Sequence, residues 1–184
     1  MPKYAICLQH KSLTFRASHF VSWLTSESRR IHVEPMHEHT FRVRATIEGP
    51  LNQHEFVVDF VAALRHLECI CKNLDQKILL PFNNDDLRVK VADGNVTLRF
   101  DRDIWDFEPF ALEFDPYEKI WSYPEQAVQW FPCANATAES IAACIAQHFR
   151  SELLACQSFA FQPDQYTIRL ELEEFPGCWA IVVI

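Results

Sequence analysis

The sequence has no apolar run approaching the roughly 18 residues that a membrane span needs, and no charged-then-apolar leader is expected at its start. It also lacks a basic excess, because 25 acidic residues outnumber 17 basic ones and give a formal charge of −8. Its seven cysteines are odd in number and show no framework spacing, which is typical of free thiols in a reducing compartment. These features predict a cytoplasmic protein and argue against partners such as nucleic acid or a membrane.

No internal repeat, low-complexity tract or linker divides the chain. At 184 residues, with 49% hydrophobic and 23% charged residues, it is predicted to form one globular domain over residues 1–184. A block at about residues 83–132 is rich in aromatic residues, yet it has few basic residues and many acidic ones. A stacking platform for bases is one interpretation. The more ordinary one is a folded insertion that packs on the core or on a neighbouring subunit.

Hydrophobic periodicity predicts the order strands, helix, helix, strands. Alternation favours strands at about residues 4–9, 13–20, 40–47, 56–58, 165–173 and 178–184. Spacings of three and four favour a helix that Asp59 caps and that carries apolar residues from Phe60 to Ile78. They favour a second helix that begins near Thr137, with a buried stripe from Ile141 to Leu153. The Asp93-Gly94 pair predicts a hairpin turn inside the insertion. The fold class is therefore α+β, with two helices on one face of an antiparallel sheet.

Two histidines stand at the start of the strand predicted at 40–47. His37 and His39 are two residues apart, so both side chains point to one face if the strand begins near them. A third imidazole from a neighbouring strand, such as His19, would complete an open metal site with a position left for substrate or water. Taken alone, the pair is also a pattern that arises easily by chance among eight histidines.

Several short motifs occur in a definite order along the chain. They are Phe15-x-Ala17-x-His19, His37-x-His39, Val57-Val58-Asp59-Phe60, Leu74-Asp75, Thr137-Ala138-Glu139, and Glu174 to Ala180 in Glu-Phe-Pro-Gly-Cys-Trp-Ala. This ordered set resembles the 6-pyruvoyltetrahydropterin synthase and 6-carboxytetrahydropterin synthase family. The resemblance implies the tunnelling fold (T-fold), whose barrel is completed by oligomerisation, commonly to a hexamer. The likeness covers almost the whole chain except the insertion.

The resemblance also implies roles for individual residues. His19, His37 and His39 match the family's zinc ligands, and Glu174 matches the glutamate that anchors the pterin ring, since a carboxylate accepts paired bonds from an amino group and an adjacent N–H. Thr137 and Glu139 match a segment that lines the pterin pocket; their other roles are helix cap and first-turn dipole partner. The usual family substrate is 7,8-dihydroneopterin triphosphate, and the implied activity is that of a zinc-dependent lyase.

The chain departs from the family pattern in the residues that move protons. The reactive cysteine usually found four residues before the histidine pair is Val33 here, and the usual aspartate–histidine pair is Asp75-Gln76. The glycine between the two zinc histidines is Glu38. The family's thiolate mechanism therefore does not carry over to this sequence.

Glu34, three residues before His37, is the candidate replacement. A glutamate at this spacing resembles a subfamily that cleaves the substrate side chain to 6-hydroxymethyl-dihydropterin, and it can serve as general base. It ranks ahead of Glu38, which would point away from the histidine face, and Asp75 is a candidate relay or support. Candidates for phosphate contacts are Arg16, Arg29 and Arg30, which otherwise serve as solvated surface residues. The alternative is a non-catalytic relative that binds zinc and pterin.

Overall fold

The computed structural model describes residues 4–24, 31–100, 120–156 and 163–184. The chain forms two compact units, one from residues 1–17, 39–76 and 138–184 and the other from residues 18–38 and 77–137. The organisation as one domain over residues 1–184 remains a prediction.

Most strands belong to one mixed sheet. Its order is β10-β6-β2-β5-β11-β12, and β1 also pairs with β5. The strands of this sheet are β1 (Tyr4–Leu8), β2 (Thr14–His19), β5 (His37–Gly49), β6 (Lys77–Pro81), β10 (Val128–Phe131), β11 (Thr167–Phe175) and β12 (Cys178–Val183). Strand β5 pairs antiparallel with β1 and β11, and β11 does so with β12, whereas β10 and β6 are parallel.

The long strand β5 alternates between a buried and a more exposed side. Phe41, Val43, Ala45 and Ile47 are buried, while the residues between them are less so. The ring of Phe41 stacks on Phe15 of β2, with centroids 5.0 Å apart. The alternation predicted for residues 40–47 is thus confirmed, and the strand itself begins three residues earlier.

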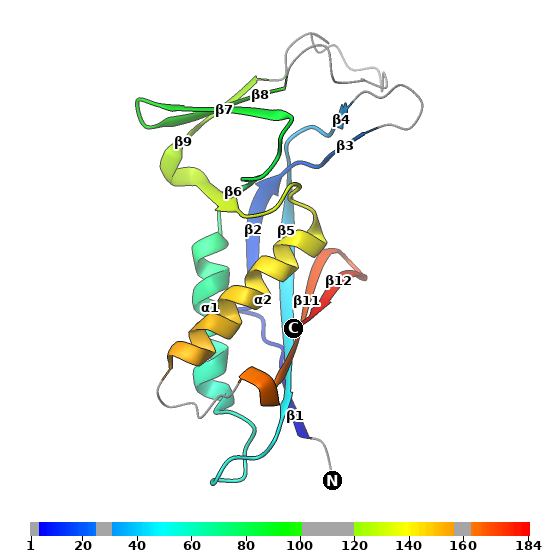
Figure 1. Cartoon of the computed structure of the whole chain (residues 1–184), viewed down its shortest axis with the longest axis vertical. Helices are drawn as coiled ribbons and strands as arrows, with labels where there is room; N and C mark the ends of the chain where they lie inside the picture. The colour runs from blue at the N-terminus through cyan, green and yellow to red at the C-terminus, as the bar shows by residue number, and fades with distance from the viewer. Residues whose placement is uncertain (1–3, 25–30, 101–119, 157–162) are drawn as a thin grey trace. The chain divides into compact units, whose positions relative to one another are not determined.

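Two helices complete the first unit. Helix α1 (Phe60–Leu74) and helix α2 (Ala138–Ala155) lie side by side, and α2 also contacts β11 and β12 (Figure 1). The carboxylate of Asp59 accepts hydrogen bonds from two backbone N–H groups of the first turn, as its cap role predicts. The predicted stripe of α2 is confirmed by buried Ile141, Ile145, Phe149 and Leu153.

Three details of the predicted elements are wrong. Helix α1 ends at Leu74, because Asp75 is extended and Gln76 takes a positive φ of 61°, so Ile78 belongs to β6. Phe60 is 61% exposed, because it precedes the first buried turn of the helix. Residues 56–58 form a loop rather than a strand, although Val57 and Val58 are buried there. An apolar run thus indicated burial without strand pairing.

The second unit holds two further sheets. Strands β3 (Ser22–Leu24) and β4 (Ile31–Val33) pair antiparallel, and β7 (Leu87–Ala92), β8 (Asn95–Phe100) and β9 (Ile120–Pro124) form a three-stranded sheet (Figure 1). The predicted hairpin is confirmed: Asp93 and Gly94 have φ values of 51° and 72°, as a two-residue turn with positive φ at both positions requires. Short 3₁₀ turns occur at Glu125–Ala127 and at Pro163–Gln165 of the first unit.

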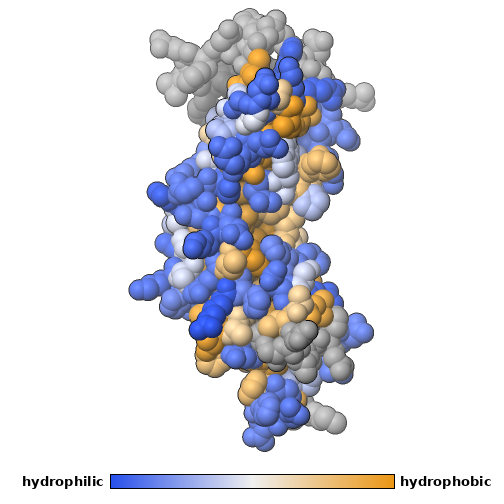
Figure 2. All heavy atoms as spheres, turned by 90° about the vertical axis from the view of Figure 1, so that its left-hand side faces the viewer, coloured by the Kyte–Doolittle hydropathy of each residue, from blue (hydrophilic) through white to orange (hydrophobic). Residues whose placement is uncertain are grey.

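The insertion shares an apolar core with other strands of the second unit. Val96, Leu98 and Phe100 pack with Phe20 and Val33 in one buried cluster, and Trp121 lies against it. This part of the predicted insertion is folded, while residues 101–119 lie outside the described ranges. The surface carries scattered exposed apolar residues, and the face in Figure 2 shows hydrophobic patches among mostly hydrophilic residues. Within the described ranges, neither helix is both long enough and apolar enough to cross a membrane.

Candidate functional site

The two paired histidines lie on one strand, as the sequence predicts. Strand β5 starts at His37, so His37 and His39 share the side on which Phe41 and Val43 are buried. The ring of His39 meets Phe41 edge-on, with centroids 5.8 Å apart. The two histidines therefore extend the buried apolar side of β5 to the start of the strand.

His19 ends strand β2 on the same principle. It follows buried Phe15 and Ala17 at two-residue intervals and is itself only 1% exposed. Its ring lies beside that of His37, with centroids 4.7 Å apart. Apolar stripes of two strands thus end in imidazoles.

Backbone carbonyls set the orientation of two of the rings. Nδ1 of His19 donates to the carbonyl of Ala136 at 2.7 Å, and Nδ1 of His37 donates to that of Pro35 at 2.8 Å. A carbonyl only accepts, so each Nδ1 carries the proton and each Nε2 keeps the lone pair that binds a metal. In both residues the tautomer suits metal ligation through Nε2.

The three histidines offer one ligand atom each within 4.8 Å of one another. Across the described ranges, no second group of histidine, cysteine or carboxylate side chains gathers in this way. Three imidazoles are a donor set that zinc accepts, and three protein ligands leave a position open for substrate or water. The residues therefore fit a zinc ion.

Glu34 lies beside this group. Its Oε2 is 4.0 Å from Nε2 of His37, and its side chain is about one-third exposed, at 34%. Pro35 restricts Glu34 to an extended backbone. Glu38 is exposed and alternates with His37 and His39 on the strand, so it faces away from them, as expected.

Glu174 follows buried Leu172 by two residues on β11 and so lies on the same side of the strand, toward His39. The register between β11 and β12 shifts between Glu173 and Phe175, an irregularity of the kind that re-aims side chains. Oε1 of Glu174 is 3.9 Å from Nε2 of His39, and the ring of Phe175 meets His39 edge-on at 4.5 Å. Alternation along β11 accounts for the side on which Glu174 lies, whereas the register shift and the contact between Phe175 and His39 have no signal in the sequence periodicity.

The other predicted site residues have different surroundings. Thr137 immediately precedes α2, and Glu139 is exposed in its first turn. The carboxylate of Asp75 accepts a hydrogen bond from the backbone N–H of Arg16 at 2.8 Å. With its amide oxygen turned toward Arg16, Gln76 accepts from Nε and Nη2 of that guanidinium at 3.0 and 2.7 Å. Asp75 and Gln76 therefore hold β2. Arg29 and Arg30 lie outside the described residues.

No thiol occupies the place of the usual base. Val33 is 3% exposed and packs in the apolar cluster of the second unit. All seven cysteines are thiols rather than halves of disulfides, and burial raises the pKa of the Cys71 thiol to about 12. A thiolate mechanism has no candidate at this position.

Comparison with known proteins identifies the family. The model of 6-pyruvoyl tetrahydropterin synthase matches residues 9–183. The chain belongs to this family. It is 29% identical to a putative 6-carboxy-5,6,7,8-tetrahydropterin synthase of Pyrococcus abyssi over 133 residues, which are 72% of the chain and 67% of the relative.

Solved structures support the T-fold. A 6-pyruvoyltetrahydropterin synthase of Plasmodium vivax superimposes with a TM-score of 0.78 at 17% identity, covering 100% of this chain and 99% of its own. The enzyme of Plasmodium falciparum gives 0.77 at 19% identity, covering 99% and 98%. The predicted family is confirmed, and so is an α+β T-fold with two helices. The prediction that the sheet is antiparallel is wrong, because β6 and β10 pair in parallel.

Proposed function

We propose that this member of the 6-pyruvoyl tetrahydropterin synthase family is a zinc-dependent lyase that acts on 7,8-dihydroneopterin triphosphate or a related pterin. The observation that carries the proposal is the approach of His19, His37 and His39 to within 4.8 Å, with Glu34 beside them. Zinc bound there would acidify a substrate hydroxyl and stabilise negative charge that develops on oxygen.

The protein's own contribution to the reaction is proton transfer. Glu34 is the proposed general base, because its carboxylate lies 4.0 Å from Nε2 of a proposed ligand and so within reach of a substrate at the open position. Oε2 of Glu34 would take a proton from the substrate side chain and return it at a neighbouring atom. One solved relative, from Plasmodium vivax, is a variant in which a glutamate named as a catalytic residue is replaced by alanine.

Glu174 is the proposed anchor of the pterin ring. Its side chain is 22% exposed, so a ligand can reach it, and its carboxylate can accept two parallel hydrogen bonds. Phe175 is 53% exposed beside it and offers an aromatic edge. Thr137 and Glu139 remain candidates for lining the pocket, and Asp75 for a supporting role through the backbone of Arg16.

The second candidate is a non-catalytic protein of the same family that binds zinc and a pterin. It is favoured by the loss of both the cysteine, now buried Val33, and the histidine, now Gln76, which bonds to Arg16. In that case the histidines and Glu174 keep their binding roles and Glu34 has none in turnover.

Product analysis separates the two functions. Zinc-loaded protein is incubated with 7,8-dihydroneopterin triphosphate, with an active relative as control, and the products are identified by mass spectrometry. Turnover that disappears in Glu34→Gln at unchanged zinc content supports the lyase. Substrate left intact by the wild type, but bound by it, would contradict the lyase and support the binding protein.

We also propose a homo-oligomer, a hexamer or similar, and a cytoplasmic location. Oligomerisation is supported by the outermost strand β12, whose Ile181 and Val183 are 48% and 58% exposed and whose edge has no partner among the described strands. Mass measurement in solution tests the assembly, and a monomer would contradict it.

A further inference from the structure

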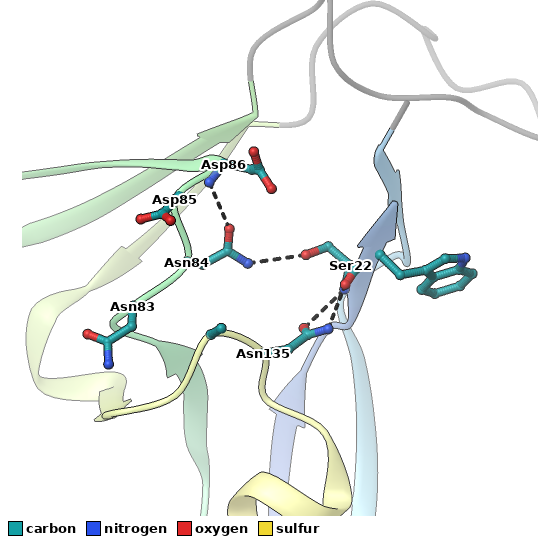
Figure 3. Close-up of a pocket in the computed structure, with 8 residues that line it drawn as sticks. Ser22, Asn83, Asn84, Asp85, Asp86 and Asn135 are labelled. Atoms are coloured by element: carbon teal, nitrogen blue, oxygen red, sulfur yellow. Dashed lines mark hydrogen bonds between the residues drawn. The ribbon is translucent and has the colours of Figure 1, made fainter. Parts of the chain in front are cut away.

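The side-chain amide of Asn135 forms two hydrogen bonds with the backbone of Ser22, near the proposed zinc site. Nδ2 of Asn135 donates to the carbonyl of Ser22 at 2.5 Å, and its Oδ1 accepts from the N–H of the same residue at 3.1 Å (Figure 3). A primary amide that both donates to and accepts from one residue imitates a strand partner. Ser22 is 9% exposed, so these bonds exchange poorly with water and losing them is costly.

The next residue along the chain holds a proposed metal ligand. The carbonyl of Ala136, a fully buried residue, accepts the bond from Nδ1 of His19. Asn135 and Ala136 therefore contact two points of one short segment, His19 and Ser22. Because the two contacts are adjacent on one loop, fixing Ser22 also fixes the carbonyl that orients the imidazole.

The same segment supports Glu34. The carbonyl of Val21 accepts from the backbone N–H of Glu34 at 3.0 Å, and Ser22 pairs with Val33 between β3 and β4. A shift of Val21 and Ser22 would thus move both the ring of His19 and the backbone of the proposed base. Asn135, which lies in the loop that precedes α2, opposes such a shift through its bonds to Ser22.

A second amide braces Ser22 from another loop. Nδ2 of Asn84 donates to the hydroxyl of Ser22 at 3.2 Å, while its Oδ1 accepts from the backbone N–H of Asp86 at 3.1 Å (Figure 3). These residues line a pocket of about 250 Å³ with Asn135. Two of the three side-chain amides that line it, those of Asn84 and Asn135, hold the segment, which favours a supporting role for this pocket.

We propose that Asn135 is a positioning residue for the zinc site, which it supports by clamping Ser22 and thereby the Ala136 carbonyl and His19. This inference rests on the proposed function for its zinc ion. Partners that orient a metal-bound histidine typically change metal affinity by about 10- to 100-fold when they are removed. The clamp should therefore be measurable in affinity rather than only in activity.

The test compares zinc dissociation constants by chelator competition. Asn135→Ala removes both bonds to Ser22 and is expected to raise the zinc Kd by about 10- to 100-fold. Asn135→Asp keeps the acceptor, but it loses the donor and sets a carboxylate oxygen against the Ser22 carbonyl, so its Kd should also rise above that of the wild type. Asn83→Ala is the matched control, because Asn83 is exposed and lines the same pocket. Its backbone N–H, which the substitution keeps, donates to the carbonyl of Cys133, so the zinc Kd should stay at the wild-type value.

A second readout needs no metal. In the zinc-free wild type, the Nδ1–H of His19 should give a slowly exchanging imidazole resonance in NMR spectra, assigned by its absence in His19→Ala. Faster exchange in Asn135→Ala supports the clamp. An unchanged Kd together with an unchanged resonance overturns it. If Asn135→Ala does not fold, Asn135→Asp carries the test with the same criteria. Absence of zinc binding by the wild type would refute the metal part of the proposed function, while the resonance still decides whether Asn135 positions His19.

Discussion

On one face of strands β5 and β11, arginines form ion pairs with glutamates. On the other face, a histidine and a glutamate lie at the proposed zinc site. On one face, Arg42 donates to Glu173 at 2.7 Å, Arg44 donates to Glu171, and Nε of Arg169 donates to Glu171 at 2.6 Å. On the other face, where Phe41 and Val43 are buried, the stripe ends in His39 and Glu174, with Oε1 of Glu174 3.9 Å from Nε2 of His39.

The difference shows how neighbouring glutamates acquire different tasks. Glu173 is held by Arg42 and by the backbone N–H of Gly177, which donates to its Oε1 at 2.7 Å. Glu174 is the next residue, and strand alternation directs it to the side of His39. We therefore expect substitutions of the carboxylates near the histidines to affect reaction and binding. Substitutions on the face where arginines pair with Glu171 and Glu173 should affect stability.

The largest effect is expected for Glu34→Gln. Removing the proposed general base should lower kcat by about 10²- to 10⁴-fold, because acid–base catalysis typically contributes that much. Zinc content, measured by atomic absorption, should not change, since Glu34 is not one of the three proposed ligands. Full activity in Glu34→Gln would place the base elsewhere.

A smaller loss is expected for Glu174→Gln. The amide cannot accept a pair of hydrogen bonds from the pterin ring, and bonds to a charged group are worth about 1.5–3 kcal/mol, or roughly 10- to 100-fold in kcat/KM. Steady-state kinetics and denaturant unfolding are measured together. If the variant loses stability but keeps kcat/KM, Glu174 has a structural role rather than a binding role.

On the paired face, Arg44→Ala should reduce stability and leave kcat unchanged. It removes bonds from Glu171, which is only 4% exposed, and the contact with the Trp179 ring, whose centroid lies 4.9 Å from Cζ of Arg44. A buried charged acceptor that loses donors costs about 1–3 kcal/mol, although Arg169 still donates to it. Arg42→Ala is the comparison, because Arg42 is 57% exposed and should contribute less. Equal losses of unfolding free energy would contradict this order.

The smallest effect is expected for Glu173→Gln, as a change in pH dependence. The hydrogen bond from Gly177 and that from Arg42 lower the pKa of Glu173. A lowered folded pKa stabilises the protein above the ordinary glutamate pKa of about 4.3, and this stability is lost as the pH falls through the folded pKa. Glu173→Gln should therefore flatten the acid side of a plot of melting temperature against pH. If the melting temperature of Glu173→Gln falls with decreasing pH as steeply as that of the wild type, Glu173 contributes nothing to the pH dependence of stability.

How much could be predicted depends on the range of the interaction. The cap at Asp59, the stripe of α2, the hairpin at Asp93-Gly94 and the alternation of β5 are all local, and all were predictable. The strand at 56–58 failed because burial of Val57 and Val58 does not require pairing. Strands β3, β4, β6, β9 and β10 are short, at three to five residues, and have little periodicity of their own.

The sequence by itself determined which residues could form the site: His37 and His39 share a side because they are two apart on a strand, and the ordered motifs indicate the family. Tertiary structure decided how that site is built. His19 is oriented by Ala136, 117 positions away in the chain, Glu174 of β11 lies 3.9 Å from His39 of β5, and Gln76 holds Arg16. Periodicity records only neighbours within a few residues, whereas these contacts arise when distant segments pair and pack.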